Sequence, residues 1–167
     1  MRAFDHSSAL TKRLDRAAIS EGPRASLATQ PVNILLVDDD PRNLLALEAV
    51  LGTPAHNLIK ANSGDEALRW LLKEDFAVIL LDVRMAGMDG LETATLIRQR
   101  PQARAIPIIF VTAANPSQTQ VARGYSLGAV DYILKPVDPE ILQAKVAAFV
   151  NLFRKTAEVR EQAVQLA

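Results

Sequence analysis

Three observations on the sequence predict an α/β fold with one parallel sheet. Short apolar runs rich in Val, Ile and Leu alternate with segments of helical periodicity from Val32 onward. The run at 77–81 is apolar throughout, which is typical of a strand buried on both faces and predicts the central strand. The alternation continues over roughly 120 residues, a pattern that favours parallel strands joined by right-handed helical crossovers.

The expected elements follow one another in a regular order. The strands are expected at residues 32–37, 57–61, 77–81, 107–112 and 130–134, and the helices at 41–51, 64–73, 91–100, 118–127 and from 139 onward. Pro41 suits the first turn of a helix. Ser63, with Glu66 three residues later, suits a helix N-terminus. Asp40 is expected to cap the first helix, and Gly128 is expected to end the fourth.

Composition excludes several classes of protein. Lys plus Arg and Asp plus Glu both number 19 in the 167 residues, so net charge favours no direct binding to nucleic acid. The absence of cysteine excludes disulfides and thiolate metal sites. No apolar stretch approaches the roughly 20 residues of a membrane span, and the N-terminus lacks the apolar core of a signal peptide. A soluble cytoplasmic protein without membrane association is therefore expected.

Residues 1–31 are expected to form an N-terminal extension and linker. Leu10, Leu14 and Ile19 fit one face of a short helix, which the Gly-Pro pair at 22–23 would end. A mobile tail and a docking helix both remain open for this segment.

Charged residues directly follow three of the expected strands. Asp38 and Asp39 follow the first strand, Asp82 follows the third, and Lys135 follows the last. The carboxyl ends of parallel strands meet at one edge of the sheet, where open α/β sheets bind their ligands. Several carboxylates with one ammonium group suit a hard divalent cation and a phosphoryl group. The pattern therefore indicates phosphoryl transfer onto an aspartate.

Four segments of the chain together resemble a known family. ILLVDDDPRN, VILLDVRMAGMDG, PIIFVTAA and GYSLGAVDYILKPV are similar, in content and order, to the receiver domain of bacterial two-component response regulators. The resemblance covers residues 32–153. It implies a flavodoxin-like doubly wound sheet with strand order 2-1-3-4-5, and a phosphorylation-dependent signalling switch rather than an enzyme for an outside substrate. A sensor histidine kinase or a phosphotransfer protein would donate the phosphate.

The resemblance also assigns the metal and acceptor residues. Asp82 matches the aspartate that accepts phosphate. Asp39, Asp82 and the backbone carbonyl of Arg84 would bind Mg²⁺ directly, whereas Asp38 would bind it through a water molecule. Magnesium favours such oxygen ligands, and without a cation the carboxylates would repel one another and raise their pKa values.

Further matches concern the phosphoryl oxygens and the switch. Thr112 matches the hydroxyl residue that contacts the phosphoryl group, and Lys135 matches the lysine that pairs with it. Pro136 matches a proline that commonly follows a cis peptide bond. Tyr132 matches an aromatic switch residue, although a plain half-buried aromatic remains open. Magnesium, a lysine and a hydroxyl donor together neutralise the charge that develops on transferring phosphoryl oxygens.

Three positions depart from the family pattern or influence the phosphate lifetime. Ala86 stands where many receivers have proline. Arg84 and Ala114 stand two residues past Asp82 and Thr112, beside the route of an attacking water. A long Arg84 would shield the acyl phosphate or hold its oxygens, whereas Ala114 would leave space, so the net effect stays open.

Residues 154–167 are expected to form a C-terminal helical extension. A heptad pattern places Leu142, Phe149, Thr156 and Ala163 at positions a, and Lys145, Leu152, Val159 and Leu166 at positions d. This imperfect seam predicts a homodimer through the last helix. A fraying tail and docking onto the domain are the alternatives.

Three other functions fit parts of the same sequence pattern. The chain could be the N-terminal receiver module of a longer hybrid histidine kinase or effector enzyme. A phosphatase of the same topology would need a second acidic residue where Arg84 stands. A non-phosphorylated interaction module would not need the intact set of site residues, which is Asp38, Asp39, Asp82, Thr112 and Lys135.

Overall fold

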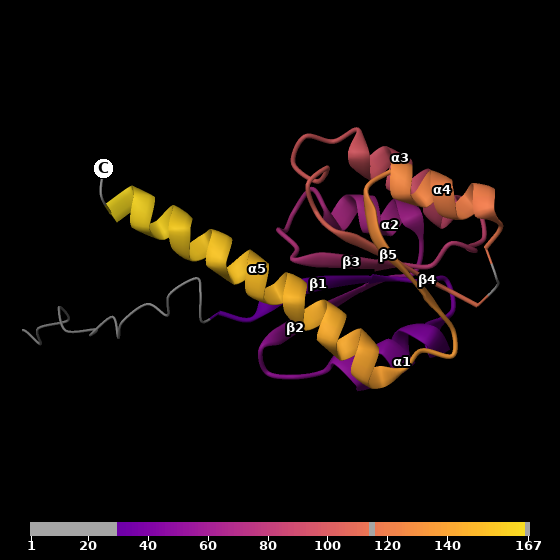
Figure 1. Ribbon diagram of the computed structural model, residues 1–167, viewed down its shortest axis with the longest axis horizontal. Helices are drawn as coiled ribbons and strands as arrows, with labels where there is room; N and C mark the ends of the chain where they lie inside the picture. Colours follow the sequence, from indigo (N-terminus) through magenta and orange to yellow (C-terminus); the bar gives the residue numbers. More distant parts are fainter. Residues whose placement is uncertain (1–29, 114–115, 166–167) are drawn as a thin grey trace, which may run out of the picture.

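The computed structural model describes residues 30–113 and 116–165, in which strands and helices alternate from β1 to α5 (Figure 1). The strands are β1 (Val32–Val37), β2 (His56–Ala61), β3 (Val78–Leu81), β4 (Ile108–Thr112) and β5 (Ala129–Leu134). The helices are α1 (Pro41–Leu51), α2 (Gly64–Trp70), α3 (Gly90–Arg98), α4 (Gln118–Ser126) and α5 (Pro139–Gln165). Every expected element is present. Residues 1–29 of the extension predicted at 1–31 lie outside the described residues.

The five strands form one parallel sheet in the order β2-β1-β3-β4-β5. This order is the doubly wound arrangement that the family resemblance implied, and β3 is the central strand as its apolar sequence predicted. From β1 the chain adds β2 on one side of the sheet and then β3 on the other, so the carboxyl ends of β1 and β3 lie at the switch point of the topology.

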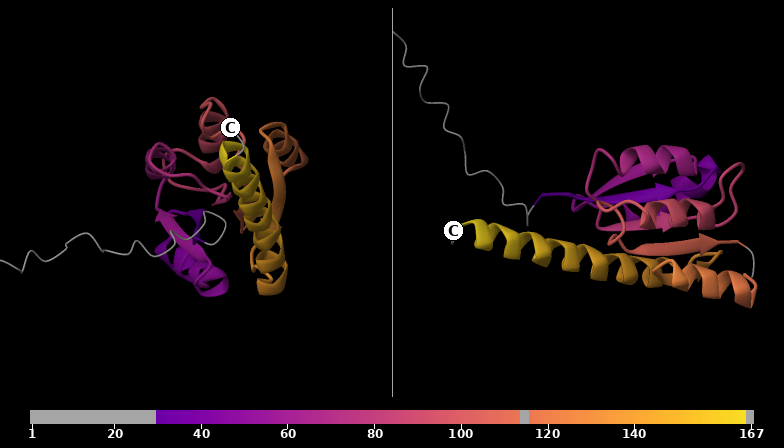
Figure 2. Two further views of the ribbon diagram at one scale, coloured as in Figure 1. Left: turned by 90° about the vertical axis from the view of Figure 1, so that its left-hand side faces the viewer. Right: turned by 90° about the horizontal axis from the view of Figure 1, so that it is seen from above.

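Helices cover both faces of the sheet, which explains why the strands are apolar throughout. Leu35, Ile79 and Phe110 point into the core under α2 and α3, together with residues of those helices. Leu36 and Leu80 point into the opposite core, where they meet residues of α1 and α5. Figures 1 and 2 show the two helical layers, with α4 beside α3. A sheet packed in this way exposes functional side chains only at its ends.

Local sequence signals set the helix ends. Asp40 caps α1 by accepting a hydrogen bond from Arg42 N, and Ser63 caps α2 by accepting one from Glu66 N at 3.1 Å. Helix α2 ends at Trp70, three residues earlier than expected, because the backbone tightens into turns there. Lys73 N donates to Trp70 O rather than to a carbonyl four residues back.

Helix α5 continues to Gln165, past the part that packs on the sheet. Leu142, Val146 and Val150 are buried against α1 and the sheet, and the helix then projects beyond the amino end of the sheet (Figure 2). Phe149 also packs against this core. The expected heptad seam is therefore wrong at its first two a positions, because Leu142 and Phe149 belong to the domain's own core.

None of the helices within 30–113 and 116–165 is both long enough and apolar enough to cross a membrane.

Candidate functional site

The parallel register of β1 and β3 brings three carboxylates together at the carboxyl edge of the sheet. Val37 pairs with Leu81, so the residues that follow each strand are neighbours. Asp82 N donates a hydrogen bond to Val37 O at 2.9 Å, which continues the ladder by one step. Carboxylate oxygens of Asp38, Asp39 and Asp82 lie within 4.8 Å of one another.

Lys135 reaches the same cluster from the end of β5. Its Nζ lies 2.9 Å from Asp38 Oδ2 and 3.8 Å from Asp82 Oδ2. Its backbone N–H donates to Thr112 O at 2.9 Å, so the ends of β4 and β5 stay aligned. The Thr112 side chain is buried at this edge, and the Lys135–Pro136 peptide bond is cis, as the resemblance implied.

Backbone amides orient each carboxylate. Asp38 Oδ1 accepts a hydrogen bond from Asp40 N at 2.9 Å. Asp39 Oδ2 accepts one from Ala86 N at 2.9 Å, and Asp82 Oδ1 accepts a longer one from Arg84 N at 3.3 Å. These bonds use one oxygen of each carboxylate and hold the cluster in place.

Gly90 lets the chain after Asp82 fold back against the aspartate. A Cβ atom at position 90 would overlap Asp82 O and lie 2.8 Å from Val83 Cα. Gly90 N also donates to Val83 O at 2.8 Å, and Asp89 caps α3 by accepting from Glu92 N. In a sequence, an Asp-Gly pair such as Asp89-Gly90 is typical of a turn and a helix entry. The close backbone approach that requires this glycine becomes visible only in the structure.

The cluster carries an excess of negative charge. Burial and the neighbouring Asp38 raise the pKa of Asp82 to about 6, although Lys135 partly opposes the rise. Asp38 is 2% exposed and Asp82 is 7% exposed. Three carboxylates facing one ammonium group suit a divalent cation, and a set of donors made only of oxygen fits magnesium.

The Tyr132 side chain of β5 packs against α4. Its hydroxyl donates a hydrogen bond to Gln120 O at 2.9 Å, and its ring stacks on Phe110 at a centroid distance of 5.1 Å. Burial raises the pKa of its phenol. The ring is thus partly buried, and its role as a switch stays a prediction.

The structure brings the charged side chains of four predicted site residues together. Asp38, Asp39, Asp82 and Lys135 converge. The Arg84 side chain is exposed, and its carbonyl stays a predicted ligand. Ala114 and its effect on an attacking water lie outside the described residues.

Comparisons with known proteins agree with this geometry. The family model described as the response regulator receiver domain matches residues 34–147. The transcriptional regulatory protein ZraR of Escherichia coli K12 is 41% identical over 113 residues, which are 68% of this chain and 25% of that protein. The cyclic di-GMP phosphodiesterase response regulator RpfG of Xanthomonas campestris is 34% identical over 137 residues, which are 81% of this chain and 36% of that protein. The chain thus spans about a quarter to a third of the length of these two curated relatives.

Solved structures of receiver domains are also similar to this chain. The chemotaxis protein CheY4 of Vibrio cholerae has a TM-score of 0.66 and 28% identity, and the match covers 71% of this chain and 98% of that one. The receiver domain of a signal transduction histidine kinase from Syntrophus aciditrophicus has a TM-score of 0.64 and 29% identity, covering 71% and 89% of the two chains.

Proposed function

The chain belongs to the response regulator receiver domain family, and we propose that its acidic cluster accepts a phosphoryl group on Asp82. The observation that carries this proposal is the convergence of Asp38, Asp39, Asp82 and Lys135 at one sheet edge. Asp82 follows the central strand, and its carboxylate lies 3.8 Å from Lys135 Nζ and close to the other two carboxylates. A sensor histidine kinase or a phosphotransfer protein is the proposed donor.

Magnesium is the proposed cofactor. Asp39, Asp82 and the Arg84 carbonyl would hold the ion directly, and Asp38 through a water molecule. When bound, it would offset the charge of the carboxylates and of the phosphoryl oxygens. The donor set supports this assignment, because it offers oxygen atoms alone at a site whose carboxylates repel one another.

The remaining residues act on the phosphoryl group through charge and hydrogen bonding. A carboxylate oxygen of Asp82 attacks phosphorus, the bond from phosphorus to the donor nitrogen breaks, and an acyl phosphate forms. Lys135 would leave Asp38 to pair with a phosphoryl oxygen, and the Thr112 hydroxyl would donate to another. Both groups neutralise charge at the position where the transferred group arrives.

Labelling with acetyl phosphate tests the proposal. Wild-type protein with Mg²⁺ should gain one acid-stable but base-labile phosphoryl group, whereas Asp82→Asn should gain none. Asp40→Asn is the matched control, because Asp40 lies at the same edge but caps α1. Beryllofluoride should likewise bind the wild type only with magnesium. Labelling of Asp82→Asn at the wild-type level would overturn the assignment.

The role of the chain beyond accepting phosphate is also a proposal. The two relatives named above are described as a transcriptional regulator and a phosphodiesterase, and they are longer than this chain. We propose a cytoplasmic regulator whose receiver has no outside substrate and does not bind nucleic acid directly. A receiver module of a longer kinase or effector enzyme is the second candidate, favoured by the continuation of α5 past the domain.

We also propose a second copy of the chain as a partner of α5. An outer stripe, defined as Ile141, Ala148, Leu152, Val159 and Ala163, runs along one face of the helix at spacings of seven and four residues. Leu152 is 58% exposed and Val159 is 64% exposed. Pairing two copies along this stripe would shelter it from water. The outer stripe replaces the seam that began at Leu142, and Leu166 lies outside the described residues.

A further inference from the structure

The first turn of α2 packs against the start of α3 so closely that residue 64 has no room for a side chain. A Cβ atom at position 64 would overlap the hydroxyl of Thr93 and lie 2.9 Å from Met88 Sδ. Gly64 and Thr93 are both buried. The φ angle of Gly64 is not positive, so its backbone conformation suits other residues too. Lack of space, and not backbone strain, therefore restricts this position to glycine.

The two neighbours of Gly64 hold the end of the β3–α3 loop (residues 82–89). The Thr93 hydroxyl donates to Asp89 O at 2.7 Å, and the Thr93 backbone N–H donates to the same oxygen at 3.0 Å. Met88 directly precedes Asp89, and its side chain packs against the core under α2 and α3. The end of this loop is therefore held in place by groups that rest against Gly64.

The β3–α3 loop supplies several of the atoms that shape the proposed Mg²⁺ site. Ala86 N donates to Asp39 Oδ2 at 2.9 Å, and Arg84 N donates to Asp82 Oδ1 at 3.3 Å. The carbonyl of Arg84 is the third proposed ligand of the ion. Magnesium requires nearly ideal octahedral geometry, so a small shift of this loop is expected to weaken binding.

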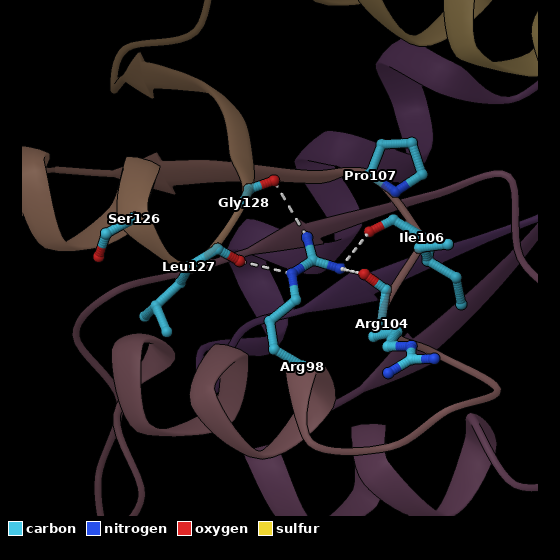
Figure 3. A pocket seen from close by; sticks show the side chains of 8 residues that line it. Arg98, Arg104, Ile106, Pro107, Ser126, Leu127 and Gly128 are labelled. Carbon is cyan, nitrogen blue, oxygen red and sulfur yellow. Dashed lines mark hydrogen bonds between the residues drawn. The ribbon is translucent and has the colours of Figure 1, made fainter.

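Helix α3 is held at its other end, so it cannot move away from Gly64 as a rigid body (Figure 3). Arg98, the last residue of α3, lines an open hollow of about 440 Å³. Its guanidinium donates to the backbone carbonyls of Arg104, Ile106, Leu127 and Gly128. Arg100 Nη1 donates to Leu68 O at 2.7 Å, which ties the segment after α3 to α2. A side chain at position 64 therefore displaces the start of α3 and the loop before it.

We propose that Gly64 is a positioning residue for the Mg²⁺ site, since the absence of a side chain lets Met88 and Thr93 hold the β3–α3 loop against the acidic cluster. This inference rests on the Mg²⁺ site proposed above. Gly64 is not itself a ligand. A Cβ atom at position 64 pushes the Thr93 hydroxyl away from Asp89 O, shifts the loop and weakens Mg²⁺ binding.

Methyl NMR on protein labelled at methionine tests the position of the loop without metal. The chain has three methionines, so three methyl resonances are expected, and Met88→Leu assigns that of Met88. In metal-free Gly64→Ala the Met88 resonance should move. Titration of the same protein with Mg²⁺ should give a dissociation constant about tenfold above that of the wild type, a usual effect of changing the groups that support metal ligands.

Two changes in the first turn of α2 serve as controls. Asp65→Ala removes an exposed side chain next to Gly64 and should alter neither the resonance nor the Mg²⁺ affinity. Ser63→Ala removes the cap of α2 and should lower the thermal midpoint without changing the Mg²⁺ affinity. If Ser63→Ala weakens Mg²⁺ binding as much as Gly64→Ala does, the loss reflects general damage to α2 and the proposal fails.

A double-mutant cycle tests whether the clash with Thr93 is the cause. Thr93→Ala removes the hydroxyl, and the atoms then nearest to the added Cβ are Met88 Sδ at 2.9 Å and Met88 Cγ at 3.4 Å, in a side chain that can adjust. In this background Gly64→Ala should cause no further loss of Mg²⁺ affinity. If Gly64→Ala alone does not fold, the double variant must fold and bind Mg²⁺ as Thr93→Ala does, and otherwise the proposal fails.

The remaining outcomes separate this inference from the proposed metal site. An unchanged Mg²⁺ affinity in folded Gly64→Ala, or a weakened affinity with an unmoved Met88 resonance, overturns the role of Gly64 and leaves the metal site standing. If the wild type binds no Mg²⁺, the proposed metal site fails and the role of Gly64 fails with it.

Discussion

Lys135 pairs with Asp38 rather than with Asp82. The ammonium lies 2.9 Å from Asp38 Oδ2 but 3.8 Å from Asp82 Oδ2. Asp38 is the more buried carboxylate, and its second oxygen accepts a hydrogen bond from Asp40 N. The lysine therefore compensates a buried charge and leaves Asp82 less fully neutralised, which agrees with the raised pKa of Asp82.

Replacing Lys135 should destabilise the fold, because the buried Asp38 carboxylate would remain without a positive partner. Lys135→Met should lower the unfolding free energy by about 3 kcal/mol at neutral pH without magnesium, because the Asp38 charge would lose its partner. Urea denaturation measures the loss. Lys60→Met is the matched control, since Lys60 pairs with Glu48 on the exposed surface, where such pairs contribute about 0–1 kcal/mol. Equal losses in the two variants would contradict the structural role of Lys135.

The stability of the protein should depend on pH through Asp82. Its pKa of about 6 in the folded state exceeds the ordinary aspartate value of 3.8, so the folded state binds the proton more tightly than the unfolded state. This contribution is fully present below pH 4 and is lost as the pH rises through 6. Without magnesium, Asp82→Asn should be more stable than wild type by about 1–3 kcal/mol at pH 8 and nearly equal at pH 4.

Denaturation of the wild type and Asp82→Asn at a series of pH values measures this difference, which isolates Asp82 from the other titrating groups. If the stability difference between the two proteins stays constant across the pH series, the pKa of Asp82 is not raised in the folded state. Magnesium should reduce the gain at pH 8, because the ion favours the ionised carboxylate of the wild type.

Magnesium should stabilise the unphosphorylated fold, since the unfolded chain has no assembled cluster to bind it. An excess of ten- to a hundred-fold over the dissociation constant would add about 1–3 kcal/mol. Thermal midpoints with and without magnesium should differ in the wild type and not in Asp39→Ala. Asp65→Ala removes an exposed aspartate of α2 and should keep the wild-type shift. An equal shift in Asp39→Ala would exclude Asp39 as a ligand.

The sequence could predict the sheet and the cluster because both follow from strand geometry. Strands buried on both faces are apolar throughout, and the residues after parallel strands meet at one edge. The proximity of Asp38, Asp82 and Lys135 could therefore be predicted from their positions at the ends of the strands. The preference of Lys135 for Asp38 could not be predicted, because it depends on side-chain conformation and on the depth of each carboxylate.

The sequence alone also could not predict the contacts between helices and the sheet. Gly124 meets Tyr132 through packing between α4 and β5, and neither residue carries a sign of the other in its local pattern. In α5, two apolar faces overlap along one helix. A heptad count cannot separate the face that includes Leu142 from the outer stripe that includes Leu152, because both have helical spacing.

The outer stripe of α5 should pair two copies of the chain weakly. The projecting turns are too short to be stable as an isolated helix and need a partner surface. If Leu152 and Val159 lie at d positions of a parallel pair, Lys155 of one copy faces Arg160 of the other, and these like charges repel. Salt screens such repulsion, so the association should strengthen as the ionic strength rises.

Light scattering over micromolar concentrations measures this association. The full chain should approach a dimeric mass at high salt, and a version ending at Phe153 should stay monomeric. Val159→Glu should also prevent dimers, because it places a charge in the centre of the outer stripe. Ala147→Glu is the matched control, as it adds the same charge at an exposed position on another face of α5. If the full chain stays monomeric with and without beryllofluoride, the outer stripe does not pair two copies, and the projecting helix instead acts as a connection to another segment.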